Sequence, residues 1–327
     1  MKEITVDVII PVYRPGERFG ELLKRLDAQT QPVNRYIIMN TEQAYWDRWL
    51  SETGYSLPEN LSVFHVTRET FDHGATRDAG IRQSDAGICV CMTDDALPAD
   101  QYLLENLVRG LTEKEGTAVA YGRQLPDWDC GIIERYTRAF NYPEESRLKT
   151  REDLPELGIK TYFCSNVCAA YKRSVYLELG GFTKKTIFNE DMIFAAGAME
   201  RGYGVFYSAG ARVIHSHNYS GIQQFHRNFD LAVSQADHPE VFSGIRSEGE
   251  GIRMVKQTAA FLVKSGKAYL IPKLIYTSGC KYLGFLMGKR YRRLPRPVIL
   301  WCTMNKAYWG NKAGSNLLEF PQTVIKK

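Results

Sequence analysis

The chain has 327 residues, of which 44% are hydrophobic and 24% charged, and its formal net charge is +5. This composition is ordinary for a globular protein and excludes global disorder, and the length suffices for a full α/β catalytic domain with a smaller appendage. The first residues carry two charges before a short apolar run, so we expect a strand there and no cleavable signal peptide. Seven cysteines without a C-x-x-C pair indicate reduced, mostly buried thiols in a cytoplasmic protein.

The positive charge is concentrated near the C-terminus. Residues 251–318 contain thirteen Lys and Arg and no Asp or Glu, which leaves a net charge of −8 on the rest of the chain. A basic, aromatic-rich segment beside an acidic body suggests a partner that this segment touches. No uncharged run there approaches the ~20 apolar residues that span a bilayer, so the segment is expected to lie on a membrane at most.

The first part of the chain alternates between apolar runs of strand length and amphipathic stretches of helix length. The expected strands are residues 6–12, 36–39, 61–66 and 87–92, and the expected helices are residues 17–29 and 74–84. This alternation predicts a doubly wound, mostly parallel α/β sheet. Such sheets bind ligands at the carboxyl ends of their strands, where residues 11–13, Asn40 and residues 94–95 fall.

The second part of the chain shows similar patterns. Short strands are expected within residues 162–171 and 205–217, with a helix between them that begins at residues 189–191. From about Gly244 onward, the pattern predicts two or three amphipathic helices that prolines interrupt, namely Pro272, Pro295 and Pro297.

Two pairs of neighbouring acidic residues are candidates for chemistry. Asp94 and Asp95 directly follow an apolar strand, where adjacent carboxylates suit Mg²⁺ or Mn²⁺ bridging to a diphosphate. The ordinary alternative is a capped turn. Glu190 and Asp191 open an expected helix, and a carboxylate there can take the proton of an attacking hydroxyl. The alternative is that acidic side chains simply favour the positive end of a helix.

Two further groups are weaker signals. His215 and His217 are two apart at the end of an expected strand, so both rings point the same way and at least one can complete a metal site. A lone His is more often a satisfied polar residue, and the cysteine spacing does not fit structural zinc. Gly74 and Arg77 lie at a helix start, which favours phosphate oxygens, although a plain helix start with an exposed Arg is the alternative. No dinucleotide or P-loop glycine motif occurs, which argues against a dehydrogenase or a P-loop enzyme.

Several short motifs occur in a fixed order along the chain. They are VIIPVY at 8–13, HGATR at 73–77, TDDALP at 93–98, SNVCAAY at 165–171, GGF at 180–182, NED at 189–191 and HSHNYS at 215–220. In this order they resemble family 2 glycosyltransferases of the GT-A fold, and above all bacterial rhamnosyltransferases of cell-surface polysaccharide synthesis. The resemblance covers about residues 4–235 and continues loosely beyond them.

The resemblance implies roles for individual residues. The expected donor-binding residues are Pro11, Val12, Tyr13, Asn40, Arg77 and Asp94. Asp95 and His217, or else His215, would hold Mg²⁺ or Mn²⁺, and Asp191 would be the catalytic base. The acceptor-site candidates are Asn166, Glu190 and Trp128. Tyr136 and Tyr142 can likewise stack on a sugar ring, or they can pack in the core.

Four positions depart from the family pattern. Thr93 stands where many relatives carry the first acid of a D-x-D triplet, and Asp78 replaces a common Asn. Asn40 replaces an acid that reads the base, although an amide can still donate to and accept from a pyrimidine edge. Asn228 replaces the Trp of the Q-x-x-R-W motif of processive relatives, so processive synthesis has no support.

We therefore expect a metal-dependent, inverting transfer in a single displacement. The first expectation for the donor is dTDP-rhamnose, with UDP-hexoses as the alternative, and the acceptor is a cell-surface polysaccharide or a lipid-linked glycan. Two other classes compete: a catalytically silent nucleotide-sugar-binding scaffold and a nucleotidyltransferase. The presence of both acid pairs argues against the first, and the lack of a Gly-rich basic loop after the first strand argues against the second.

The expected organisation is a GT-A domain followed by a basic tail. Residues 1–125 would bind the nucleotide sugar, residues 126–243 the acceptor, and residues 244–327 would form amphipathic helices. Residues 251–318 would place the protein peripherally at the inner face of the plasma membrane through anionic lipids, or would pack on the acidic body instead. No nucleic acid partner is expected.

Overall fold

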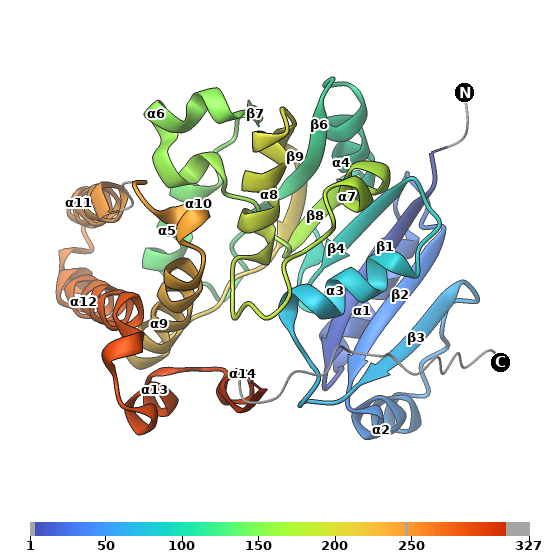
Figure 1. The fold of residues 1–327 in the computed structure, drawn as a ribbon, viewed down its shortest axis with the longest axis horizontal. Coiled ribbons are helices and arrows are strands. Elements are labelled where there is room, and N and C mark those ends of the chain that lie inside the picture. The colour runs from blue at the N-terminus through green and yellow to red at the C-terminus, as the bar shows by residue number, and fades with distance from the viewer. Residues whose placement is uncertain (1–3, 246–247, 312–327) are drawn as a thin grey trace.

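The computed structural model describes residues 4–245 and 248–311, and within them nine strands form one sheet (Figure 1). The strands lie in the order β3 (Leu61–Val66), β2 (Arg35–Thr41), β1 (Val6–Tyr13), β4 (Ile88–Met92), β8 (Cys168–Lys172), β6 (Thr117–Leu125), β9 (Gly204–Ile214) and β5 (Leu97–Pro98), and β7 (Arg147–Lys149) pairs with β9. Only β8, β5 and β7 run against the direction of the others in this sheet. The expectation of a mostly parallel sheet is therefore confirmed.

Helices cover both faces of this sheet. Their bounds are α1 (Glu17–Asp27), α2 (Gln43–Thr53), α3 (His73–Arg82), α4 (Leu103–Thr112), α5 (Ile132–Asn141), α6 (Leu154–Leu157), α7 (Arg173–Glu178) and α8 (Glu190–Glu200), with short 3₁₀ helices η1 (Arg151–Asp153) and η2 (Gly158–Thr161). Successive strand residues point to opposite faces, so Val8 and Ile10 of β1 pack with α1, α2 and α4, while Ile9 packs with α3, α7 and α8. The apolar run that predicts β1 is thus buried on both sides.

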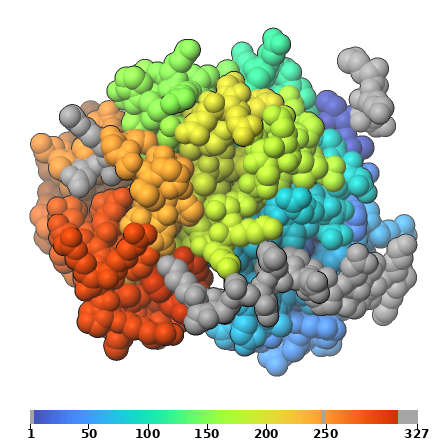
Figure 2. All heavy atoms as spheres, in the orientation of Figure 1, coloured from blue at the N-terminus to red at the C-terminus, as the bar shows by residue number. Residues whose placement is uncertain are grey.

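The C-terminal part is helical and packs on the body. It contains α9 (Gly221–Asp237), α10 (Pro239–Phe242), α11 (Glu248–Lys264), η3 (Ala268–Leu270), α12 (Ile271–Lys289), η4 (Tyr291–Arg293), α13 (Arg296–Cys302) and α14 (Lys306–Asn311). Gly284 of α12 packs against the carbonyl oxygen of Phe225 in α9, so no side chain fits between these two helices. The orange and red helices lie directly against the rest of the molecule in the space-filling view (Figure 2).

The prolines in the described part of the tail lie at helix starts. Pro272 and Pro297 lie in the first turns of α12 and α13, where a missing N–H breaks no helical hydrogen bond. No helix among the described residues is long and apolar enough to cross a membrane. The part of the basic segment beyond residue 311 lies outside the described residues.

Some local expectations were wrong. The strand expected within residues 162–171 begins only at Cys168, because Tyr162 follows a 3₁₀ helix and fills the core from a loop. No pattern that we recognised predicted α2, α4 or β6, although the two Trp residues of α2 lie on its buried face. All seven cysteines are free thiols and six of them are buried, as expected.

Candidate active site

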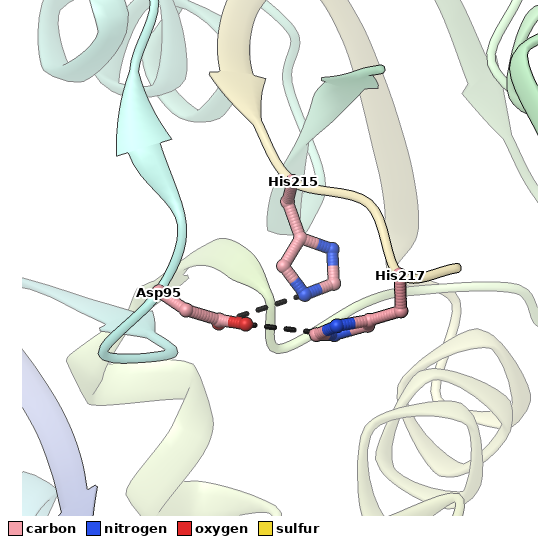
Figure 3. A group of neighbouring side chains, drawn as sticks. All are labelled: Asp95, His215 and His217. Atoms are coloured by element: carbon pink, nitrogen blue, oxygen red, sulfur yellow. Dashed lines mark ion pairs between the residues drawn. The ribbon is translucent and has the colours of Figure 1, made fainter. Parts of the chain in front are cut away.

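Asp95, His215 and His217 converge at the carboxyl end of the sheet. Asp95 lies between β4 and β5, and β5 pairs with β9, with Leu97 opposite Ile214, which brings Asp95 beside the two histidines (Figure 3). His215 Nε2 lies 3.6 Å from Asp95 Oδ1, and His217 Nε2 lies 3.5 Å from Asp95 Oδ2. One ligand atom of each residue lies within 4.8 Å of the others. Both rings point toward the carboxylate, although β9 ends at Ile214, so the histidines lie in the loop after the strand and not on one face of it as expected.

The two histidines are neutral near pH 7. Burial lowers the pKa of His215 to about 3, against the opposing effect of the Asp95 carboxylate. Burial also lowers the pKa of His217. A neutral imidazole carries one nitrogen lone pair, and a nearby carboxylate offers oxygen ligands. The group therefore has the donor atoms that a divalent cation needs.

A cavity of about 440 Å³ lies at the ends of β1 and β4, and Asp94, the neighbour of Asp95 in sequence, lines it, whereas Asp95, His215 and His217 are not among its lining residues. Five of the six expected donor-binding residues line it, namely Pro11, Val12, Tyr13, Arg77 and Asp94. Asp94 Oδ2 accepts a hydrogen bond of 3.3 Å from the Tyr13 amide, which joins the ends of β1 and β4. Burial, and then the charge of Asp95, raise the pKa of Asp94 to about 6.

Asn40 is the expected donor-binding residue that does not line the cavity. Its side chain is fully buried, and Nδ2 lies 2.9 Å from His65 Nδ1 and donates to the Glu42 carbonyl at 3.1 Å. Asn40 and His65 are register partners in the parallel pairing of β2 and β3. The amide is thus directed toward β3, and the neighbouring Thr41 lines the cavity in its place.

Several residues of the cavity wall were not expected from the sequence. Arg68 lies two residues after the end of β3, and Arg227 and Asp230 belong to α9. Met304 and Asn305 come from the segment between α13 and α14, so the tail contributes to the same wall. Arg68 follows the end of a predicted strand, which is a signal that sequence reasoning can use. The tail residues carry no such signal.

The lining of the cavity includes three arginines and two aspartates, Asp94 and Asp230. Arg68, Arg77 and Arg227 all line it. The Arg68 guanidinium lies 5.8 Å from the centre of the Tyr13 ring, and that of Arg227 lies 5.0 Å from the Phe188 ring. Guanidinium groups match phosphate oxygens in geometry and charge. This arrangement suits a ligand with two or more phosphates.

The start of α8 carries the second acid pair. Arg77 Nη1 lies 3.3 Å from Glu190 Oε1, and Asn166 Nδ2 donates to the same oxygen at 3.1 Å. Burial opposes the charge of Glu190, but the Arg77 charge prevails and holds the Glu190 pKa below its ordinary value. Arg77 is therefore a buried ion-pair partner that also lines the cavity, and not the exposed Arg of a plain helix start.

Asp191 differs from its neighbour. Its Oδ2 accepts a hydrogen bond of 2.9 Å from the Asn166 amide, and its Oδ1 accepts one of 2.8 Å from the Met192 amide. Burial, and then the charge of Glu190, raise the pKa of Asp191 to about 7. A carboxylate with a pKa near neutrality exchanges a proton readily, which is what general base catalysis requires.

Gly74, Tyr142 and Tyr136 make contacts within the chain, which is the ordinary alternative that was left open for each of them. Gly74 lies against the Thr183 carbonyl oxygen, so this glycine makes room for the chain itself and not for a ligand. Tyr142 is buried in the core, and Tyr136 stacks on Phe261 of α11 at 4.5 Å between ring centres. Among the three aromatic residues considered for sugar stacking, only Trp128 stays exposed, with 90% of its surface accessible.

Fold and site together show an α/β protein with a cavity lined by three arginines, a group of residues that could hold a metal (Asp95, His215 and His217) and a carboxylate with a raised pKa, that of Asp191. The sequence profile of the family described as "Glycosyl transferase family 2" matches residues 7–180. The chain is 37% identical over 310 residues to the O-antigen chain rhamnosyltransferase RfbN of Salmonella typhimurium, covering 94% of this chain and 96% of that protein. It is 36% identical over 309 residues to the O-antigen chain rhamnosyltransferase WbaN of Salmonella anatum, covering 93% and 95%.

Among solved structures, the fold is similar to a mannosyltransferase from Pyrobaculum calidifontis that was solved in complex with GDP-mannose and Mn²⁺. The TM-score is 0.52 at 16% identity, covering 94% of this chain and 86% of the other. The chain belongs to family 2 of the glycosyltransferases, and it has their GT-A fold with an added helical C-terminal region.

Proposed function

We propose that this glycosyltransferase transfers rhamnose from dTDP-rhamnose to a cell-surface polysaccharide or a lipid-linked glycan. The observation that carries the proposal is the cavity, in which Arg68, Arg77 and Arg227 face a space of about 440 Å³ beside Asp94. The choice of sugar is supported by the two O-antigen rhamnosyltransferases, because the similarity to them includes the tail as well as the catalytic part. UDP-hexoses are the alternative donors.

Mg²⁺ or Mn²⁺ would be held by Asp95 with His215 and His217. The donor set fits, because its ligand atoms lie within 4.8 Å of one another and both imidazoles are neutral near pH 7. Carboxylate and imidazole together suit Mn²⁺, whereas Mg²⁺ prefers oxygen ligands. When bound, such an ion neutralises negative charge on a diphosphate.

The chain's own residues account for the rest of the reaction. The acceptor hydroxyl oxygen forms a bond to the anomeric carbon, and Asp191 takes its proton. The bond from the anomeric carbon to the phosphate oxygen breaks, and its electron pair leaves with the nucleoside diphosphate. The charges of Arg68 and Arg227 offset the negative charge of that leaving group. A single displacement of this kind inverts the anomeric carbon.

We assign the acceptor to residues 126–243 and the nucleotide sugar mainly to residues 1–125. Trp128 is the acceptor-site candidate with an exposed ring, which can stack on a sugar. Asn166 and Glu190 are buried, so they would act by holding Asp191 and Arg77 in place.

The test is a panel of nucleotide sugars with purified protein and Mn²⁺, with release of nucleoside diphosphate and of pyrophosphate measured separately. The proposal expects turnover of dTDP-rhamnose with release of dTDP. Turnover of UDP-hexoses alone would show that the donor is a UDP-hexose and not dTDP-rhamnose. Release of pyrophosphate would indicate a nucleotidyltransferase. Nucleotide-sugar binding without turnover, even with lipid-linked acceptor present, would indicate a silent scaffold.

We also propose that the tail attaches the protein to the anionic inner face of the plasma membrane. The support is an exposed set of aromatic side chains on a segment without acidic residues between 251 and 318. Tyr269, Tyr276 and Trp301 are 73%, 56% and 61% exposed. Phe261, another aromatic residue of this segment, is instead stacked on Tyr136.

Liposome flotation tests this attachment. Each Lys or Arg near an anionic surface contributes on the order of 1 kcal/mol, and salt screens the attraction. The protein should float with vesicles that contain phosphatidylglycerol and should be released by salt. Flotation should fall in a Tyr269→Ser, Trp301→Ser variant, while a Trp128→Ser variant, changed outside the tail, should float as wild type does. Failure of the wild-type protein to bind anionic vesicles in low salt would remove the proposal.

A further inference from the structure

Gln124 of β6 contacts the His215 ring at Nδ1, the ring nitrogen that does not face Asp95. Its side chain is 3% exposed, and its strand pairs with β9, with Leu125 opposite Ile214. Gln124 Oε1 lies 3.0 Å from His215 Nδ1. Arg138 Nη1 of α5 donates to the same Oε1, and Gln124 Nε2 donates to Ser165 Oγ at 3.0 Å. The amide is thus held on both sides.

These contacts determine which nitrogen of His215 carries the hydrogen. A guanidinium has only donors, so the Gln124 atom that Arg138 meets is the amide oxygen. An amide oxygen only accepts, so His215 Nδ1 must be the donor in its 3.0 Å contact with that oxygen. With that hydrogen on Nδ1, Nε2 is the ring nitrogen that can offer a lone pair to a cation. Nε2 is the atom that lies 3.6 Å from Asp95 Oδ1.

Arg138 is itself fixed. Its Nε donates to Glu134 Oε1 at 2.8 Å within α5, and the side chains of this pair are 15% and 20% exposed. The amide of Gln124 therefore cannot reverse without opposing an N–H group to the Arg138 guanidinium. The Ser165 hydroxyl, which accepts from Nε2, can donate as well as accept, so the Arg138 contact is the one that fixes the orientation of the amide.

His217 has no comparable support. Among the described residues, no hydrogen bond reaches its Nδ1, and its ring contacts are the rings of His215 and Tyr219 at 4.6 and 5.0 Å between centres. About a third of its side chain is accessible to solvent. Among the described residues, a hydrogen bond to Nδ1 therefore fixes the tautomer of His215, and no such bond fixes that of His217.

We propose that Gln124 is a positioning residue that holds His215 with its Nε2 lone pair toward Asp95, and that His215 is the pre-oriented metal ligand of the pair. The second half of this statement rests on the proposed metal dependence. The first half concerns the metal-free protein and stands apart from it. When a histidine binds a metal through one ring nitrogen, the other nitrogen usually makes a hydrogen bond. Removal of that hydrogen bond typically lowers metal affinity 10- to 100-fold.

The experiment compares wild-type protein with Gln124→Met and Gln124→Glu. Met has a similar length and cannot accept the hydrogen bond strongly, whereas Glu keeps an acceptor oxygen for both His215 and Arg138. Gln29→Met is the matched control, because Gln29 is also buried and also bonded through its amide, but to Arg25, Asp100 and Leu104. Circular dichroism melting verifies that all variants fold.

Two readouts are needed, and neither is enzyme activity. Long-range ¹H–¹⁵N correlation spectra of metal-free, ¹⁵N-histidine-labelled protein report the tautomer of His215, whose signal a His215→Gln variant identifies. Titration with MnCl₂ alone, followed by electron paramagnetic resonance, reports the Mn²⁺ dissociation constant. We expect the Nδ1–H tautomer in wild type, Gln124→Glu and Gln29→Met, and a mixture of tautomers in Gln124→Met with a 10- to 100-fold weaker Mn²⁺ affinity.

Several results would overturn the proposal. An Nε2–H tautomer of His215 in wild type, or unchanged spectra and Mn²⁺ affinity in Gln124→Met, would remove the role of Gln124. If His217→Gln loses more Mn²⁺ affinity than His215→Gln does, the pre-oriented ligand is His217 and not His215. If wild type keeps the Nδ1–H tautomer but binds no Mn²⁺, the metal dependence and the ligand assignment fail, while the positioning of the ring by Gln124 stands.

Discussion

The guanidinium of Arg77 lies 3.3 Å from the carboxylate of Glu190, and both side chains are buried. A buried ion pair resists the loss of either partner, because the remaining charge would have no compensation. Asn166 adds a hydrogen bond to the same Glu190 oxygen. Glu190 is therefore committed to the architecture of the site. Adjacent helical residues point about 100° apart, so Asp191 faces elsewhere and is the better candidate for the acceptor proton.

Asp191→Asn should abolish most of the transfer while the protein still binds its donor. The base acts only as the acceptor attacks, and general base catalysis typically contributes 10²- to 10⁴-fold. Asn is nearly isosteric and can still accept from the Asn166 amide. We expect the transfer rate to fall by about that factor, and the dissociation constant for dTDP, measured by calorimetry, to change little.

Glu190→Gln should act mainly on stability. Removing one partner of a buried ion pair costs about 3 kcal/mol or more, so the variant should unfold at a lower urea concentration than Asp191→Asn. Glu113→Gln is a suitable control, because Glu113 forms an exposed pair with Arg109. The opposite outcome would be near wild-type turnover in Asp191→Asn and a stable but inactive Glu190→Gln. In that case Glu190, and not Asp191, is the general base.

The transfer rate should rise with pH up to about neutrality. Burial and the charge of Glu190 raise the pKa of Asp191 to about 7, and only the ionised form accepts a proton. Below pH 7 the rate at saturating donor and acceptor should therefore fall about tenfold per pH unit, and above pH 8 it should level off. Glu190→Gln removes the second cause of the raised pKa, so the midpoint of its pH–rate profile should move to lower pH. If the midpoint of the pH–rate profile does not move in Glu190→Gln, the group whose ionisation controls the rate is not Asp191.

The location of the site follows from the sequence because its residues end strands. An apolar run buried on both faces predicts β1, and Asp94 and Asp95 directly follow the run that forms β4. In a parallel sheet such ends meet at one edge, which is why Tyr13 donates to Asp94. The two histidines follow β9 and reach the same edge. The location of the site can therefore be predicted once the sequence shows which segments are strands and where each strand ends.

What the sequence could not predict depends on register and on distant packing. Asn40 ends β2 as expected, but its side chain is taken up by His65, a partner that only the register of β3 provides. Met304 and Asn305 reach the cavity because α13 packs on α9 through Ile299 and Phe229, and nothing local marks them. Propensity and periodicity describe elements, whereas such contacts depend on how the elements meet.

Asp95→Asn should weaken metal binding and turnover together. The substitution keeps the shape of the side chain but removes the charge that a divalent cation needs. Asp100→Asn is a control, since Asp100 forms an ion pair with Arg212 and lies outside the group of Asp95, His215 and His217. We expect excess EDTA to stop wild-type transfer and added Mn²⁺ to restore it, whereas Asp95→Asn should need far more Mn²⁺. Full activity in EDTA, or a normal Mn²⁺ requirement in Asp95→Asn, would contradict the metal assignment.

Residues 303–304 of the tail are tied to the cavity wall by the carboxylate of Asp230. Asp230 of α9 accepts a hydrogen bond of 2.6 Å from Thr303 Oγ1 and one of 2.9 Å from the Met304 amide. Asp230, Met304 and Asn305 all line the cavity. The tail segment therefore forms part of the wall against which a nucleotide would lie, and its position depends on Asp230.

Thr303→Val should consequently weaken nucleotide binding from a position in the tail. The change keeps the shape of the side chain but leaves one oxygen of the buried Asp230 without its donor. A hydrogen bond to a charged group contributes about 1.5–3 kcal/mol, so a wall that is no longer held should raise the dissociation constant for dTDP about tenfold. Thr303→Ser keeps the hydroxyl and should bind as wild type does. Thr277→Val removes a hydroxyl that bonds only within α12, and it should also leave binding unchanged. Calorimetric titration with dTDP distinguishes the outcomes: equal affinity in Thr303→Val and wild type would mean that the tail segment merely borders the cavity without shaping it.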